Sequence, residues 1–113
     1  MRYIKEGPFL DRKGNQVVVP TTEPTDCTVG WVLTFVASTY HPTAAYTMQQ
    51  SDVRRYNRVL DVLEAEPVDG QYAFEDTDFE ILKKVVNVMA PLNLVPQVFR
   101  NSPELEDLLA AAE

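Results

Sequence analysis

Cysteine and histidine are almost absent from this sequence, with one residue of each in 113. A lone cysteine, Cys27, excludes an intramolecular disulfide and a cysteine-based metal cluster. The N-terminal residues contain no apolar signal-peptide core, and the longest apolar-rich stretch, residues 29–37, is too short to span a bilayer. These absences predict a soluble, cytoplasmic protein without a membrane partner.

Basic residues are also few, at 10 against 17 acids, which gives a formal net charge of −7. A negative field repels nucleic-acid backbones unless a local basic patch overrides it. The two basic clusters, at residues 54–58 and 83–84, are short, and neither interleaves aromatic side chains in the pattern that stacks on bases. We therefore expect no nucleic-acid partner.

What the sequence does contain is the composition of one globular domain. Apolar residues make up 45% and charged residues 24%, and the eight prolines lie between apolar runs, where connections belong. A chain of this length is suited to one core rather than two. We expect a single compact domain over residues 1–113.

Residues 8–19 have the pattern of a β-hairpin. Two apolar arms, residues 8–10 and 16–19, flank a turn in which Gly14 and Asn15 can adopt positive φ. The valines favour strands because branched side chains suit a pleated surface. A second turn at residues 67–70 precedes a short extended segment at residues 71–74.

Four helices are expected, at residues 27–39, 51–65, 77–89 and 103–112. Residues 29–37 would also suit a buried strand, but a cap precedes them and their apolar residues recur at helical spacing. The predicted apolar stripes are Val29, Val32, Leu33 and Val36, then Val53, Tyr56, Leu60 and Leu63, then Phe79, Leu82, Val86 and Met89, and finally Leu105, Leu108 and Leu109. The elements together predict an α+β fold, with an N-terminal hairpin packed on a bundle of three to four short helices.

Polar residues at the helix starts can satisfy the free amides of each first turn. Thr77 and Glu80 match a capping box, which makes the third helix the best defined. The other expected caps are Thr25 or Asp26, Ser51 or Asp52, and Ser102 with Pro103 behind it.

No catalytic or metal-binding motif is present. The acidic run at residues 75–80 lacks the glycine of a calcium loop and coincides with a helix start. His41 could act as an acid or base with Asp52, and Cys27 as a nucleophile, but no pattern brings the three together. We therefore expect no enzyme, no cofactor and no metal, with a hydrolase using His41 as a distant third hypothesis.

Two groups of residues are candidates for binding a partner. On the first helix, Trp31 and Phe35 form an apolar ridge apart from the buried stripe, and aromatic anchors are enriched at interfaces. The hairpin could also cover this ridge, which would make Trp31 a core residue. The acidic stretch contributes Glu75, Asp76 and Asp78 as a second candidate surface.

The order of these segments resembles an uncharacterised family of small acidic proteins encoded by tailed bacteriophages and prophages. The resemblance rests on residues 9–17 (FLDRKGNQV), 26–33 (DCTVGWVL), 54–63 (RRYNRVLDVL) and 74–86 (FEDTDFEILKKVV). The loop at residues 40–50 departs from it, with aromatic and polar residues in place of a charged linker. The resemblance implies an accessory role in the host cytoplasm or the phage particle and supplies no site residues.

The sequence thus predicts a non-enzymatic protein that binds a phage or host protein, or a second copy of itself, in particle assembly or host control. The alternative is an acidic inhibitor that mimics nucleic acid on a host enzyme. A contiguous acidic face would favour the mimic, whereas mixed charge around an apolar patch would favour the binding module.

Overall fold

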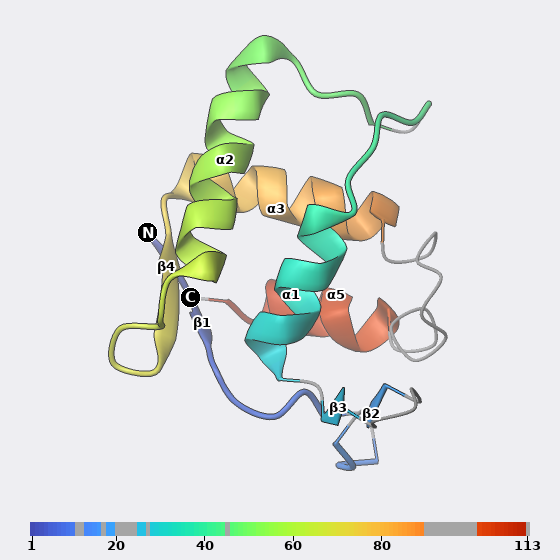
Figure 1. The fold of residues 1–113 in the computed structure, drawn as a ribbon, viewed down its shortest axis with the longest axis vertical. Helices are drawn as coiled ribbons and strands as arrows, with labels where there is room; N and C mark the ends of the chain where they lie inside the picture. The colour runs from blue at the N-terminus through green and yellow to red at the C-terminus, as the bar shows by residue number, and fades with distance from the viewer. Residues whose placement is uncertain are drawn as a thin grey trace.

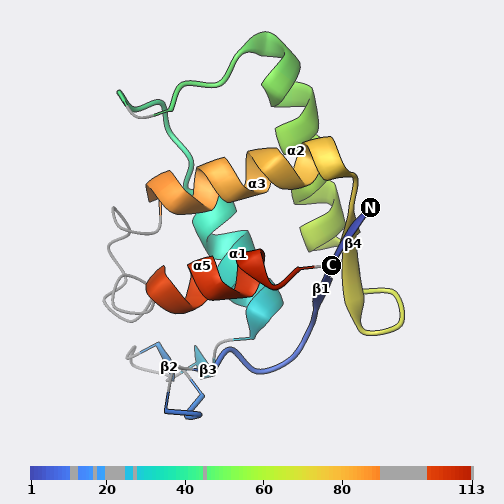
Figure 2. The same ribbon diagram turned by 180° about the vertical axis from the view of Figure 1, so that it is seen from behind.

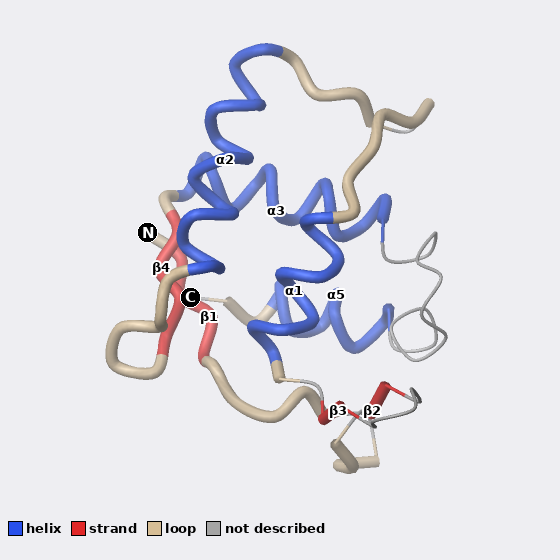
Figure 3. Tube along the Cα trace, viewed as in Figure 1, coloured by secondary structure: helices blue, strands red, loops and turns tan. Residues whose placement is uncertain are grey.

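The computed structural model describes residues 1–10, 13–16, 18–19, 25–26, 28–44, 46–89 and 102–112. Within these ranges the chain has an α+β fold with an N-terminal antiparallel β-structure and four helices (Figure 3). The helices are α1 (Val29–Ser38), α2 (Gln50–Glu64), α3 (Asp76–Met89) and α5 (Ser102–Ala110). The strands are β1 (Arg2–Lys5), β2 (Val18–Val19), β3 (Thr25–Asp26) and β4 (Gln71–Phe74).

The helices lie in two crossed layers. Seen from the front and from behind, α1 and α2 form one layer, and α3 and α5 cross them in the other (Figures 1 and 2). The β1–β4 pair closes one side, and the small β2–β3 pair lies near the start of α1. The core between the layers is apolar, and its fully buried side chains include Leu33, Val36, Val59, Phe74, Leu82, Val86 and Leu105.

Helix α1 is confirmed as a helix, so the strand alternative for residues 29–37 is wrong. Its predicted stripe is buried, with Val32, Leu33 and Val36 each 0% exposed. The predicted cap is wrong, because Thr25 and Asp26 form β3 and the cap is Thr28, whose Oγ1 accepts from the Trp31 N–H at 3.1 Å. The first helical turn therefore starts two residues later than expected.

The predicted stripe of α2 is confirmed in part, because Leu63 is buried and Tyr56 and Leu60 are half-buried against the core. Val59 and Leu63 are buried, whereas Val53 is 42% exposed. The reason is tertiary, because the start of α2 projects beyond α3 (Figure 1) and Val53 lies at the surface there. Its start is also corrected: Gln49 is the cap, and the Asp52 carboxylate accepts from the Gln49 N–H at 3.2 Å.

Helix α3 confirms its predicted stripe, since Phe79, Leu82, Val86 and Met89 are all buried. The capping box is wrong, because the helix begins at Asp76 and Thr77 therefore lies inside its first turn. Helix α5 buries Leu105 and Leu109 as expected. The side chains of Ser102 and Pro103, and the residues between α3 and α5, lie outside the described part of the chain.

The N-terminal hairpin is confirmed where it is described: Leu10 and Gln16 form an antiparallel bridge, and Gly14 adopts a φ of +85° in the turn. Beyond this bridge, β2 pairs with β3, which the sequence did not predict. The loop expected between the first two helices is also present in its described residues, 39–44 and 46–49.

The largest strand pairing joins two segments that are far apart in the sequence. Strand β1 pairs antiparallel with β4, with Ile4 opposite Tyr72 and Lys5 opposite Gln71. Positive φ at Asp69 and Gly70 makes the tight turn that leads into β4, as the sequence predicted for residues 67–70. Strand β1 itself was missed, because a four-residue strand has no pattern that distinguishes it from a loop.

We expect Leu82→Ala to lower the free energy of unfolding by about 2–5 kcal/mol, because the side chain is 1% exposed and truncation leaves a cavity. Val53→Ala and Thr77→Ala are matched controls on the exposed faces of α2 and α3, and each is expected to change it by no more than about 0.5 kcal/mol. Denaturant unfolding of the three variants measures these values. A neutral Leu82→Ala, or a costly Thr77→Ala, would contradict the packing described above.

Candidate partner-binding surfaces

The carboxylate of Glu6 connects three parts of the chain at the start of α1. Its Oε1 accepts from the Gly7 N–H at 2.8 Å and from the Gly30 N–H at 3.0 Å, and its Oε2 accepts from the Tyr72 hydroxyl. The Val29 N–H donates to the Gly7 carbonyl at 2.9 Å. With the Thr28 cap, the amides of the first turn are satisfied, and a negative charge sits at the positive end of the helix dipole.

Gly30 makes this arrangement possible because it lacks a side chain. A Cβ at position 30 would overlap the Tyr72 hydroxyl and the Glu6 carboxylate. Gly30 is buried inside α1, where glycine normally costs stability relative to alanine. The close approach of Glu6 and Tyr72 explains why glycine is nevertheless favourable here.

The environment of Tyr72 shifts its ionisation. Burial, together with the hydrogen bond to Glu6 and the charge of that carboxylate, raises the pKa of the Tyr72 phenol from 10.0 to about 12. Burial likewise raises the pKa of Tyr46, with the Asp52 charge adding to it, and the pKa of Tyr56, with Tyr40 adding to it. All three phenols therefore hold their protons more tightly than exposed tyrosines do.

Tyrosines order the loop between α1 and α2. The Tyr40 ring lies 5.9 Å from that of Tyr46 and 5.7 Å from that of Tyr56, centroid to centroid. The Tyr40 hydroxyl accepts from the Met48 N–H at 2.9 Å, and the Tyr56 hydroxyl donates to the Ala37 carbonyl. This cluster connects the loop to both helices, so the departure from a charged linker at residues 40–50 has a structural reason.

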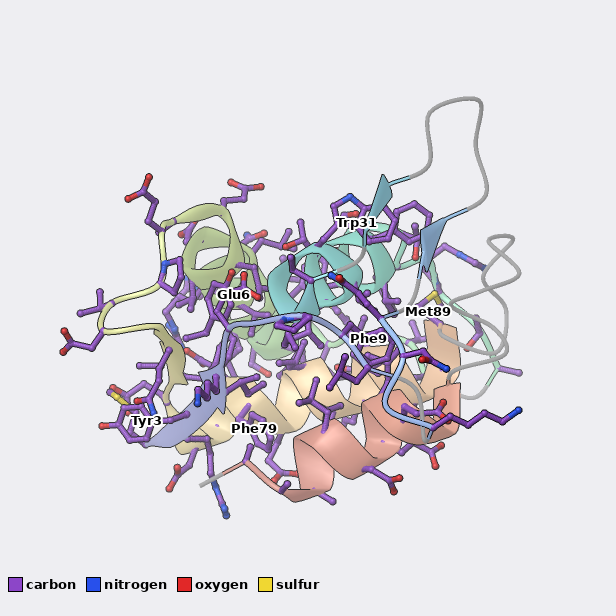
Figure 4. All side chains as sticks on the ribbon, turned by 90° about the horizontal axis from the view of Figure 1, so that it is seen from below. Tyr3, Glu6, Phe9, Trp31, Phe79 and Met89 are labelled. Carbon is purple, nitrogen blue, oxygen red and sulfur yellow. The ribbon has the colours of Figure 1, made fainter. Side chains whose placement is uncertain are left out.

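The structure brings Trp31 and Phe35 together. Their rings stack with centroids 5.2 Å apart and planes 11° apart, and both side chains are half-buried at the edge of the core. Figure 4 shows Trp31 on the outer side of α1, near β3. Because the two side chains are only partly buried, part of their apolar surface remains accessible beside the buried stripe of α1. We call these two residues the α1 ridge.

The three acidic candidates do not form one surface. Glu75 and Asp76 are exposed, but Asp78 is buried, with 6% of its side chain accessible. Both Asp78 oxygens accept from Arg58, at 2.9 Å from Nε and 2.8 Å from Nη2. The prediction of Asp78 as a contact for a partner is therefore wrong, because its carboxylate fastens α3 to α2.

Basic groups neutralise several of the other acids. Asp76 lies 3.1 Å from the amino group of Met1 and 3.8 Å from Arg2 Nε. Glu80 lies 3.8 Å from Lys83 Nζ, and Asp52 lies 3.8 Å from Arg55 Nη1. Apart from the half-buried Asp52, the groups in these pairs are exposed, so the pairs contribute little stability. The pairs of Asp76 and Glu80 do place positively charged groups beside the acidic stretch at residues 75–80.

A further surface, which the sequence did not indicate, surrounds Tyr3 on the outer face of the β1–β4 pair. Tyr3 is 43% exposed and projects from β1 at the periphery of the molecule (Figure 4). It lines two grooves, of about 490 Å³ beside the end of α5 and about 320 Å³ beside the end of α2. Since β1 was missed, its outer face could not be predicted either.

Of the three residues proposed for chemistry, the structure describes His41 and Asp52, which make separate contacts. His41 is exposed, and its Nδ1 lies 3.3 Å from the Thr39 carbonyl. Asp52 is engaged with the start of α2, and Cys27 lies outside the described residues. Among the described residues, no group of three or more histidine, cysteine or acidic side chains could hold a metal ion. None of the described helices combines the length and apolar character needed to cross a lipid bilayer.

Gly30→Ala is expected to destabilise the fold by about 1–3 kcal/mol, because the added methyl group must displace Tyr72 or Glu6. This is opposite in sign to the usual effect of this substitution in a helix. Tyr72→Phe removes one of the overlapping groups, so Gly30→Ala should cost less in that background. Denaturant melts of the four proteins form a double-mutant cycle. Additive costs would contradict the contact.

Stability should fall as the pH rises between 10 and 12, partly because of Tyr72. Its pKa is raised in the folded state, so the contribution is complete below pH 10.0 and is lost as the folded form also ionises near pH 12. Unfolding free energies measured across this range should decline less steeply in Tyr72→Phe. An identical decline would show that Tyr72 ionises normally.

No protein-family model matches this chain, and neither the curated proteins nor the solved structures include a significant match.

Proposed function

We propose that this protein acts by binding another protein through the α1 ridge, without catalysing a reaction. The observation that carries the proposal is the stacked, half-buried pair of Trp31 and Phe35 beside a helix stripe that is already buried. The inward face of α1 is occupied by Val32, Leu33 and Val36 without help from the pair. Two large aromatic rings therefore remain available at the edge of the core.

The physical properties of the pair suit a binding contact. Aromatic side chains remove a large apolar area from water on association while losing few rotatable torsions. Stacking already restricts both rings, so less conformational entropy remains to be lost when a partner covers them. The start of α1 is in turn held by Glu6 and Thr28, so the ridge stands on a rigid element.

The charge distribution supports a binding module over a nucleic-acid mimic. A mimic requires acids in uninterrupted rows, whereas Asp78 is buried under Arg58, and Asp76 lies beside Arg2. Three of the described acids between residues 64 and 80, namely Asp76, Asp78 and Glu80, thus lie beside basic groups. The resemblance to phage and prophage accessory proteins suggests the host cytoplasm or the phage particle as the setting.

The test compares three tagged baits: the wild-type chain, Trp31→Ala and Val53→Ala. Each is used to capture proteins from cells carrying a tailed phage or prophage, with quantitative mass spectrometry as the readout. We expect Val53→Ala to retain the wild-type partner and Trp31→Ala to lose it, because Val53 is exposed on another helix. Circular dichroism should show the same helical signal for all three.

Two outcomes would contradict this proposal. If Trp31→Ala unfolds as readily as Leu82→Ala, the ridge belongs to the core and is not a contact surface. If it folds and captures the same protein as Val53→Ala does, the binding surface lies elsewhere.

A further inference from the structure

Strand β1 has one edge that faces away from β4. The Glu6 N–H donates to the Gly70 carbonyl at 2.8 Å, and β1 continues this register with Ile4 opposite Tyr72. In an antiparallel pair, alternate residues direct their N–H and C=O groups toward the partner strand. The N–H and C=O groups of Ile4 therefore point toward β4, whereas those of Tyr3 and Lys5 point away from it, to the outer edge.

No described residue pairs with that outer edge. The end of α5 lies beside β1 in both views (Figures 1 and 2), but its last amides bond within their own chain segment. The Ala111 N–H donates to the Asp107 carbonyl at 3.0 Å, and the Ala112 N–H to the Leu109 carbonyl at 3.3 Å. Between this helix end and β1 runs the groove of about 490 Å³, lined by Tyr3, Lys5, Leu108, Ala111 and Ala112 among others.

We propose that a second copy of this chain adds its β1 antiparallel to this edge, which makes a four-stranded sheet across the dimer. The two-fold axis passes at Ile4, so that Tyr3 of each copy lies opposite Lys5 of the other. Each of these two equivalent pairs exchanges two backbone hydrogen bonds. The N–H and C=O groups of Tyr3 and Lys5 are then satisfied in both copies.

The side chains favour this register over its neighbours. An axis at Lys5 would place the two Lys5 ammonium groups opposite each other, and like charges in that position are destabilising. An axis at Tyr3 would place Lys5 opposite the amino group of Met1. With the axis at Ile4, Lys5 instead lies beside the aromatic ring of Tyr3, where a cation–π contact is favourable. Ile4 meets its own copy on the apolar inner face.

This surface is independent of the α1 ridge. In Figure 4, Tyr3 and Trp31 lie well apart on different sides of the molecule. Pairing through β1 leaves the α1 ridge accessible. A variant that loses dimerisation through β1 can therefore keep partner binding through the ridge, and the reverse also holds. A dimer would also present two copies of the ridge to one partner assembly.

The first experiment measures amide hydrogen exchange of the full-length wild-type protein across a concentration series, with molar mass from light scattering. At low concentration the Tyr3 and Lys5 amides should exchange rapidly, while the Ile4 amide is protected by β4. As the measured mass rises to that of a dimer, the Tyr3 and Lys5 amides should become protected from exchange to the same extent. A single mass of one chain at all concentrations would overturn the proposal, as would a dimer whose Tyr3 and Lys5 amides stay unprotected.

The second experiment removes one edge donor. Proline is tolerated on an edge strand where its missing N–H faces outward, so Lys5→Pro should fold as a monomer with the β1–β4 pair intact. We expect its dimerisation to be at least about tenfold weaker than that of Lys5→Ala, which keeps the N–H but loses the same charge. Equal dimerisation of the two variants would overturn the proposal. If the edge instead binds an extended segment of a different protein, Lys5→Pro would lose that protein while the wild type alone stays monomeric, which would also overturn self-pairing.

Discussion

The rest of the structure depends on a single carboxylate. Glu6 follows β1, accepts from Gly30 at the start of α1 and from Tyr72 in β4, and so joins three segments that are far apart in the sequence. Without it, the Gly30 amide in the first turn of α1 would lose its acceptor, and the N-terminal segment would lose a side-chain contact that it makes with both α1 and β4. Gly30 allows the contact because any side chain there would occupy the space that the carboxylate and the phenol share. This contact therefore holds the end of β1 against both the start of α1 and β4.

Three of the acidic residues, Glu6, Asp52 and Asp78, have structural roles inside the fold. Asp78 receives both donors of the Arg58 fork, so a buried charge is fully paired and fastens α3 to α2. Asp52 closes the capping box of α2, and Glu6 caps α1. Part of the acidic character that gives the net charge of −7 is therefore taken up within the protein, because Asp78 is buried against Arg58, and Asp76 and Glu80 lie beside basic groups. This is why we infer recognition through apolar contacts rather than through a charged surface.

Two kinds of contact remain available once the core is complete, and they differ in their physics. The α1 ridge offers apolar area on a rigid helix, so its partner is selected by shape and by the exclusion of water. The β1 edge offers unpaired backbone donors and acceptors, which any extended strand can satisfy, so selectivity comes from register and flanking side chains. In a symmetric pairing of two copies, the residues of β1 themselves supply both the register and the flanking side chains. The short strand and Lys5 limit open-ended association, which long apolar edges promote.

The sequence by itself determined the α+β class, four helices and most of the buried stripes, because apolar residues recurring at helical spacing must face a core. It also determined the two turns at Gly14 and Gly70, where positive φ is needed. It placed the cap of α1 at Thr25 or Asp26, which is three or two residues before the observed cap, Thr28. It also offered Asp78 as a surface residue. Only the tertiary structure decided these points, together with the exposure of Val53 and the existence of β1. The physical reason is that these features depend on contacts between segments that are far apart in the sequence. Arg58 pairs with Asp78, β4 pairs with β1, and the projecting end of α2 leaves Val53 exposed. The local spacing of residue types cannot predict such contacts.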